Sequence, residues 1–351
     1  MFENLRMLSR NCGNKAKLVS MNEISSGVEL NLVSVPCALC GSAETAPRPV
    51  FESFDYEYRT CDNKFQFIAC AKCGHVYLSP RIRMRDIDRI YPRNYTVRVT
   101  ETQYPAFAPF RWLKLNVLDR GWNRKVIANL RAGSRVLDIG AGFGGNLTYL
   151  AKLAPFPLEL FANDLKFEPE ARSYLSDRGV TLIEGPVEEV QCEERFDAII
   201  CQHAIEHVTD PGRLVRWISD HLAPGGVLYL ETPDLNALSR YFFKNHWQAL
   251  STPRHFHLFS RKALAACIRG GNLEIEFHGA IVEASQWSVS LRIKLGMEPY
   301  APRSTGFMYS MISYDNFFTK CISCMIDLSA IMLGLSTVTQ ALIARKPAAL
   351  A

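Results

Sequence analysis

The chain has 351 residues, of which 48% are hydrophobic and 21% charged, and its formal net charge is +5 at pH 7. This composition is that of a folded globular protein and excludes an intrinsically disordered one. The length suffices for about two domains, so we expect a small module attached to one larger domain.

Residues 1–30 carry charged side chains and asparagines but no continuous apolar segment of the kind found in secretory signals. We therefore expect a flexible N-terminus and a cytoplasmic protein. The eleven cysteines, an odd number, agree with this location, because cytoplasmic thiols stay reduced or bind metals, whereas secreted proteins usually pair them.

Two Cys-x-x-Cys-Gly motifs, at 37–41 and 70–74, predict a zinc ribbon over residues 31–80. Thiolates two residues apart at a tight turn can face one ion, and four of them complete the tetrahedral shell of structural zinc. The alternating apolar residues of 65–69 and 76–78 would form its strands. The alternative is two unrelated pairs of buried thiols. The predicted zinc ligands are Cys37, Cys40, Cys70 and Cys73.

Residues 81–130 predict a helical linker, with helices near 82–91 and 112–130 and a loop at 104–109. Between Arg81 and Lys125 the sequence has eleven Lys and Arg against four Asp and Glu. A solvated helical surface explains this excess, and a surface that attracts a phosphate-bearing acceptor is the alternative. The segment lacks the regular interleaving of aromatic and basic residues in a nucleic-acid stacking platform, which argues against a nucleic-acid partner.

From Arg135 onward the sequence predicts a strand, a glycine turn and a helix in succession. The β-branched run 135–139 leads into Gly140-Ala141-Gly142-Phe143-Gly144, and an amphipathic helix follows. This order is typical of a Rossmann-like nucleotide-binding unit, in which glycines let the backbone approach the ligand. Asp138 precedes the turn, and Asp164 ends the next strand, where a carboxylate can accept hydrogen bonds from ribose hydroxyls.

These residues resemble the class I S-adenosylmethionine-dependent methyltransferases, and with the ribbon in front the chain is similar to the bacterial ribbon-bearing members of that class. The resemblance implies an α/β fold with a Rossmann-like seven-stranded sheet in a methyltransferase domain over 131–351. The remaining strands are expected at 181–185, 196–201, 222–230, 273–277 and 340–345.

The resemblance also implies that the glycine turn holds the methionine end of S-adenosylmethionine and that the acidic end of the second strand binds its ribose. Pro186 stands where the family has an acidic residue for adenine, and Glu188 follows nearby. The expected cofactor-binding residues are Asp138, Gly140, Gly142, Gly144, Asp164 and Gln202.

After the fourth strand the sequence His203-Ala204-Ile205-Glu206-His207 has the order His-x-x-Glu-His. Zinc peptidases carry the same order, but they need a long helix and a third ligand beyond it, which this context lacks. The carboxyl edge of an open α/β sheet is where ligands bind. Three roles therefore stay open: packing with helix capping, general base catalysis by a histidine, and binding of a divalent ion.

The segment 253–259 supplies two more histidines, and Trp247 before it is expected to line the acceptor pocket. The ubiquinone-pathway and small-RNA 2′-O-methyltransferases have Glu-x-x-Glu-His and a later histidine at these places, which implies a second divalent metal here. The ligands so implied are His203, Glu206, His207 and His257. The candidate catalytic residues, expected to converge near the transferable methyl group, are His203, His207, His255 and His257.

The apolar segment Cys321–Ala344 is long enough to cross a bilayer. Gly334 and Ser336-Thr337 interrupt it, so we expect a buried helix followed by a buried strand, with no membrane span. Cys321 and Cys324 would then belong to the core.

Together these features predict an S-adenosylmethionine-dependent methyltransferase that modifies a hydroxyl of a small acceptor. A phosphate- or nucleotide-linked glycan or natural-product precursor is the expected acceptor. The alternatives are transfer to carbon or nitrogen on the same scaffold, and an RNA-binding or RNA-methylating protein that uses the ribbon and the basic segment. The sequence indicates no particular oligomeric state.

Overall fold

The computed structural model describes residues 28–92, 121–283, 285–300, 306–313 and 316–348. The expected flexible N-terminus up to residue 27, the loop expected at 104–109 and the first part of the helix expected at 112–130 lie outside these ranges. The described part of that helix is α2, Trp122–Ile127.

A seven-stranded sheet forms the centre of the chain, in the order β12-β13-β10-β9-β6-β7-β8. Each strand lies where the sequence predicts it, which confirms the Rossmann-like fold class. Strand β13 runs antiparallel to both neighbours, whereas the pairs from β10 through β8 are parallel. The strands are β6 (Arg135–Ile139), β7 (Glu159–Asp164), β8 (Thr181–Glu184), β9 (Phe196–Gln202), β10 (Leu222–Pro233), β12 (Glu274–Ile281) and β13 (Thr339–Arg345).

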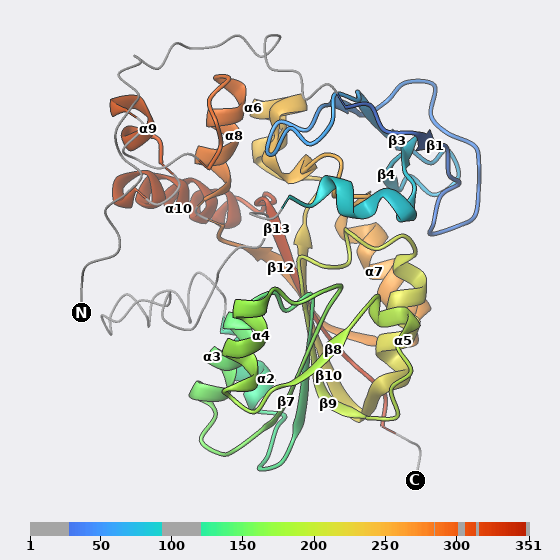
Figure 1. Ribbon diagram of the computed structural model, residues 1–351, viewed down its shortest axis with the longest axis vertical. Coiled ribbons are helices and arrows are strands. Elements are labelled where there is room, and N and C mark those ends of the chain that lie inside the picture. Colours follow the sequence, from blue (N-terminus) through green and yellow to red (C-terminus); the bar gives the residue numbers. More distant parts are fainter. Residues whose placement is uncertain (1–27, 93–120, 284, 301–305, 314–315, 349–351) are drawn as a thin grey trace.

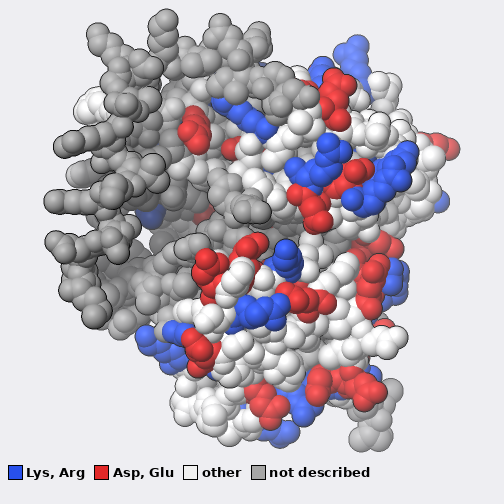
Figure 2. Space-filling model, in the orientation of Figure 1, with Lys and Arg blue, Asp and Glu red and all other residues white. Residues whose placement is uncertain are grey.

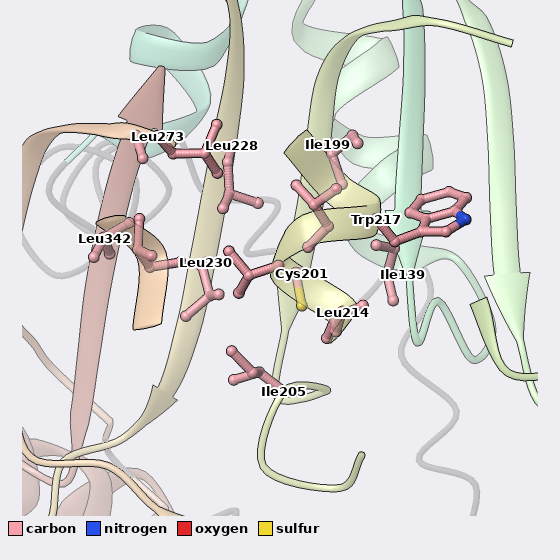
Figure 3. Close-up of a cluster of buried hydrophobic side chains, with 14 of the residues drawn as sticks. Ile139, Ile199, Cys201, Ile205, Leu214, Trp217, Leu228, Leu230, Leu273 and Leu342 are labelled. Carbon is pink, nitrogen blue, oxygen red and sulfur yellow. The ribbon is translucent and has the colours of Figure 1, made fainter. Parts of the chain in front are cut away.

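Helices cover both faces of this sheet (Figure 1). Parallel strands covered on both faces need continuous apolar sequence, and runs such as 198–201 provide it. Figure 3 shows the core beneath α5, where Cys201 and Leu230 of adjacent strands pack with Leu214 and Trp217. One face is covered by α2, α3 (Gly145–Leu153) and α4 (Pro169–Ser176), and the other by α5 (Pro211–His221) and α7 (Arg261–Gly270).

The N-terminal module is a small antiparallel sheet, as the sequence predicts for a ribbon, but one of its strands comes from the larger domain. Its order is β11-β4-β3-β2, and β11 is His257–Leu258. In this pairing His257 lies opposite Tyr77, and Leu258 lies opposite Val76. The other elements are β1 (Leu32–Val33), β2 (Phe51–Ser53), β3 (Phe65–Ala69), β4 (Val76–Leu78) and β5 (Arg81–Ile82).

The short helix expected at 82–91 is present as the 3-10 helix η2, Met84–Ile90. Further along the chain, several short helices lie with the ribbon at the end of the sheet where β10 leads into α6 (Figure 1). They are α6 (Leu238–Phe243), η6 (Lys244–His246), η7 (Gln248–Leu250), α8 (Gln286–Lys294), α9 (Phe307–Met311) and α10 (Phe317–Met332).

The expectation of a buried helix within Cys321–Ala344 is wrong. Helix α10 buries only one side, on which Asp327 accepts a hydrogen bond from Trp287 Nε1 of α8 at 2.9 Å. Its other side is open, with Phe318 74% and Met332 79% exposed, and Cys321 and Cys324 are partly exposed rather than core residues. Among the described helices none combines the length and apolarity required to span a bilayer.

Candidate active site

The glycine turn after β6 has the backbone that its sequence requires. Gly140, Gly142 and Gly144 have φ values of +71°, +54° and +66°, a region that side chains with a Cβ rarely adopt. A Cβ on Gly140 would lie 3.0 Å from Ala204 Cβ, and one on Gly144 would overlap Leu175 Cδ2. A Cβ on Gly142 would meet no described atom within 4 Å, so Gly142 is the glycine that faces open space.

Two carboxyl groups flank this turn. Asp164 Oδ2 accepts a hydrogen bond from Gly142 N at 2.8 Å, which joins the end of β7 to the turn. Burial and the neighbouring Asp164 raise the pKa of Asp138 to about 8, and burial also raises the pKa of Asp164. Buried carboxyls of this kind favour a ligand that brings positive charge or hydrogen-bond donors.

Gln202, at the carboxyl end of β9, offers a further polar group. Its Oε1 is buried and finds no hydrogen-bond partner among the described residues. A buried amide oxygen without a partner is costly, so a ligand donor at this place would be stabilising. Together with the open space at Gly142, this orphan oxygen fits a polar cofactor at the carboxyl edge of the sheet.

His203 follows Gln202 directly and forms a pair with Glu206. His203 has φ +51°, and its Nδ1 lies 3.2 Å from Glu206 Oε1. Glu206 is fully buried, and its other oxygen accepts a hydrogen bond from Thr232 Oγ1 at 2.8 Å. The His203 side chain remains 38% exposed, so this imidazole is held at one nitrogen and accessible elsewhere.

The charges of the pair follow from this geometry. Burial opposes a charge on His203, but the hydrogen bond and the negative charge of Glu206, then Glu231, raise the pKa of His203 to about 9. Burial opposes ionisation of Glu206 as well, but His203 outweighs it and lowers the pKa of Glu206 to about 2. Near neutral pH the pair is an imidazolium beside a carboxylate.

Glu231 is a site residue that the sequence analysis missed. It lies opposite Gln202 in the β10–β9 register, its Oε2 is 3.9 Å from His203 Nε2, and it accepts a hydrogen bond from Tyr229 OH. The signal was available, because a glutamate inside the apolar strand 227–233 is unusual unless it serves a site.

His207 and His255 lie together next to Glu206. Their rings are 4.6 Å apart, and ligand atoms of Glu206, His207 and His255 lie within 4.8 Å of one another. Each Nδ1 contacts a backbone carbonyl, Arg254 O at 3.1 Å and Ala249 O at 2.8 Å respectively. Burial lowers the pKa of both rings, for His255 to about 3, so each is neutral, and a ring whose Nδ1–H donates to a carbonyl carries its lone pair on Nε2.

The structure brings three of the four predicted histidines together and places the fourth elsewhere. His257 Nδ1 is 3.0 Å from Nε2 of His75, a ribbon residue, and His257 is not among the clustered ligand atoms. Of the expected metal set, Glu206 and His207 belong to this group, His203 and His257 do not, and His255 is the third member. The reason is that His257 belongs to β11, and its side chain contacts His75 of the ribbon.

Trp247 is also placed differently from the prediction. It is 1% exposed in the core between the ribbon and the larger domain, where its Nε1 donates to Ser239 Oγ at 2.9 Å. Its ring centroid is 6.2 Å from that of Phe51. Trp247 is thus a packing residue that joins the two parts.

The four cysteines of the predicted ribbon site converge. Cys37 Sγ is 3.6 Å from Cys73 Sγ, Cys40 Sγ is 3.5 Å from Cys70 Sγ, and all four sulfurs lie within 4.8 Å of one another. Four thiolates around zinc at about 2.3 Å would lie about 3.8 Å apart, so the group has the size of a tetrahedral zinc shell. Cys61 is buried apart from this group, as a spare thiol would be.

Comparisons with known proteins support the assignment of a methyltransferase domain. A family model described as a methyltransferase domain matches residues 116–277. A ubiquinone biosynthesis O-methyltransferase of Xanthomonas axonopodis pv. citri is 33% identical over 158 residues, 41% of this chain and 64% of that protein. Its counterpart in Bordetella bronchiseptica is 33% identical over 135 residues, 36% of this chain and 54% of that protein. The chain thus spans less than two thirds of the length of these relatives.

Among solved structures, the chain is similar to the 1,6-didemethyltoxoflavin-N1-methyltransferase of Burkholderia thailandensis, with TM-score 0.45 and 16% identity over 87% of this chain and all of that one. The strand order, the glycine turn and the family match define the class of the domain: it is a methyltransferase domain with the fold of the class I S-adenosylmethionine-dependent enzymes. Within that class, the named relatives given above are O-methyltransferases of ubiquinone biosynthesis.

Proposed function

We propose that this methyltransferase transfers a methyl group to a hydroxyl of a small acceptor, with His203 as the general base. The observation that carries the proposal is the His203–Glu206 pair at the carboxyl edge of the sheet, next to the glycine turn. The O-methyltransferase relatives support a hydroxyl as the methylated group. The alternative is transfer of the methyl group to a carbon or nitrogen atom of the acceptor.

The cofactor residues support S-adenosylmethionine in this site, which supplies an electrophilic methyl on a sulfonium when bound. Gly142 leaves the backbone open, and Asp164, already aligned by Gly142 N, would bind ribose hydroxyls. Asp138 and Gln202 offer the carboxyl and the unpartnered amide oxygen described above. The adenine contacts near Pro186 and Glu188 stay a prediction.

His203 has the arrangement of a base oriented by a carboxylate. Glu206 fixes Nδ1, which leaves Nε2 to take the proton of an acceptor hydroxyl, and the resulting imidazolium is stabilised by the same carboxylate. In the free protein the pKa of about 9 keeps this ring protonated at neutral pH. A cation near the turn disfavours a second positive charge, so His203 would lose its proton more readily beside a sulfonium.

A small, phosphate-bearing acceptor, such as a linked glycan or natural-product precursor, fits the described surface better than RNA. Arg85 and Arg89 of η2 keep 70% and 54% of their side chains exposed, and both lie 3.8 Å from the one carboxylate of Asp86, so these three residues keep a net positive charge for a phosphate. On the face in Figure 2, blue and red side chains of the described residues are interspersed rather than gathered into one basic surface. Nucleic-acid binding normally needs such a continuous basic surface.

The experiment uses a deletion strain, whose extract accumulates the unmethylated acceptor. Purified protein with methyl-labelled S-adenosylmethionine should label one compound in this extract, heavier by one methylene, and the linkage of the methyl should be an ether. His203→Gln should lower labelling about a hundredfold or more while cofactor affinity in calorimetry stays unchanged. His246→Gln, a substitution in η6, serves as the matched control. A carbon- or nitrogen-linked methyl, or full activity in His203→Gln, would overturn the proposal.

A second candidate mechanism uses a divalent ion held by Glu206, His207 and His255. The Nδ1 contacts of both histidines with backbone carbonyls resemble the outer contacts that orient metal-binding histidines. Against it, both oxygens of Glu206 already have partners in His203 and Thr232. Reversible inhibition by a chelator, together with loss of a metal equivalent in His255→Ala, would favour the ion over the base.

The ribbon thiols support a structural zinc held by Cys37, Cys40, Cys70 and Cys73, since their spacing fits the ion. The cytoplasmic location expected for the chain would keep these thiols reduced. Protein purified without added metal should then carry about one zinc per chain in elemental analysis. A metal-free preparation that is fully folded would refute this site.

A further inference from the structure

The ribbon reaches the active site through one short strand. Leu78 N donates to Phe256 O at 2.8 Å, and β4 then pairs with β11. On the other side of this strand, Phe256 N and His257 N donate to Glu206 O at 2.7 and 3.2 Å. The backbone of Glu206 is therefore held by the same segment that completes the ribbon sheet.

His75 connects this segment to the cysteine site. It follows Cys73 and Gly74 directly, and its carbonyl accepts a hydrogen bond from Cys70 N at 2.9 Å. Its ring nitrogen Nε2 lies 3.0 Å from His257 Nδ1, and both residues are 1% exposed. One ring nitrogen must donate a hydrogen bond and the other must accept it, because two buried nitrogens at this distance that both carried or both lacked a proton would leave a polar group unsatisfied.

A displacement of β11 would also move the His203–Glu206 pair. Glu206 orients His203 through its side chain, while its carbonyl depends on two amides of the β11 segment. The neighbouring Arg254 carbonyl also fixes the ring of His207. A shift of His257 would thus reach both the candidate base and the adjacent histidine cluster.

We propose that His75 and His257 are positioning residues, which couple the geometry of the cysteine site to Glu206 and thereby to His203. Filling of the four-cysteine site by zinc then orders the active site as well as the ribbon. The inference extends the proposed role of the His203–Glu206 pair, but its test needs neither the acceptor nor methyl transfer.

Packing alone is the competing account of His75. Its ring centroid lies 5.1 Å from Phe259 and 6.1 Å from Tyr77, so it also stacks in an aromatic group. Two substitutions separate the roles. His75→Phe keeps a ring for stacking and removes the hydrogen bond, whereas His75→Gln removes the ring and keeps an amide near the place of Nε2.

The readout is hydrogen exchange of the full chain, followed by mass spectrometry of peptides that cover 203–208 and 254–259. In His75→Phe we expect exchange in both peptides to accelerate about five- to tenfold, the scale of one lost neutral hydrogen bond. In His75→Gln we expect exchange close to that of the wild type. His246→Phe, on η6, is the control for a general effect of replacing a histidine by phenylalanine.

Zinc removal provides a second test, which uses wild-type protein and so does not depend on whether a variant folds. Wild-type protein treated with a strong chelator should show faster exchange in 203–208 as well as in 70–78, and added zinc should reverse both changes. Two results would overturn the proposal. One is that peptide 203–208 exchanges in His75→Phe at the same rate as in the wild type. The other is that zinc removal accelerates exchange in 70–78 alone. If methyl transfer to a hydroxyl is absent, the exchange results still decide the coupling.

Discussion

The glycine turn permits a test in which three alanine substitutions at left-handed glycines have three different outcomes. Gly142→Ala should weaken cofactor binding and cost little stability, because its Cβ enters open space. Gly144→Ala should mainly destabilise the fold, because its Cβ overlaps the buried side chain of Leu175. Gly133→Ala is the control, since this glycine has φ +79° and no described atom within 4 Å of a Cβ.

The magnitudes follow from the backbone and the neighbours. Each alanine in the left-handed region costs about 1–2 kcal/mol, which is the whole loss of unfolding free energy expected for Gly142→Ala and Gly133→Ala. Gly144→Ala adds overpacking against Leu175, about 1–3 kcal/mol, because the leucine end can rotate but is fully buried. Gly144→Ala should therefore be the least stable of the three.

Urea unfolding measures the stabilities, and calorimetry with S-adenosylmethionine measures the affinities. We expect at least tenfold weaker binding in Gly142→Ala and unchanged binding in Gly133→Ala. If Gly142→Ala binds the cofactor as the wild type does, the open space at this glycine is not the cofactor site. If Gly144→Ala is no less stable than Gly133→Ala, the packing argument fails.

Three further predictions follow from single side chains. Cys73→Ser should lower the zinc content from about one equivalent to nearly none in elemental analysis, and retained zinc would exclude a four-thiolate site. Asp164→Ala should abolish measurable cofactor binding in calorimetry with cooperative unfolding retained, and an unchanged affinity would remove its ribose role. The pKa of His203, about 9, exceeds its ordinary 6.5, so the stabilisation that it gains from Glu206 is complete below pH 6.5 and is lost as the pH rises through 9. Urea unfolding should show a steeper decline in the wild type than in His203→Gln, in which only Asp138, with its pKa of about 8, and the other groups still contribute. Equal slopes would contradict the ion pair.

The strands of the central sheet could be predicted because their signal is local. Buried parallel strands such as β6 and β9 consist mainly of β-branched and apolar residues. A glycine turn follows β6, and a Pro-Gly-Gly segment lies in the first part of β10. The four-cysteine site could likewise be predicted from the spacing of its two Cys-x-x-Cys pairs alone. In both cases the information lies within a few neighbouring residues.

Which histidine joins Glu206 could not be predicted, because it depends on contacts distant in sequence. A tight turn, in which Arg254 N donates to Ser251 O at 2.8 Å, places His255 beside His207. Two residues of strand, β11, are too few to give a periodic pattern, and their partner lies far away at β4. For α10, an apolar sequence indicates burial only when neighbours cover every side, and here α8 covers one.

The strand β11 limits how the ribbon could be exchanged between enzymes. A chimaera that transplants residues 31–80 alone would leave β4 without its partner and expose the edge of a small sheet, a common origin of aggregation. A graft that also carries 253–259 would bring the donor's His255 and His257 into the active site of the recipient. The ribbon and the segment 253–259 would therefore have to be exchanged together, although the chain between them contains most of the methyltransferase sheet.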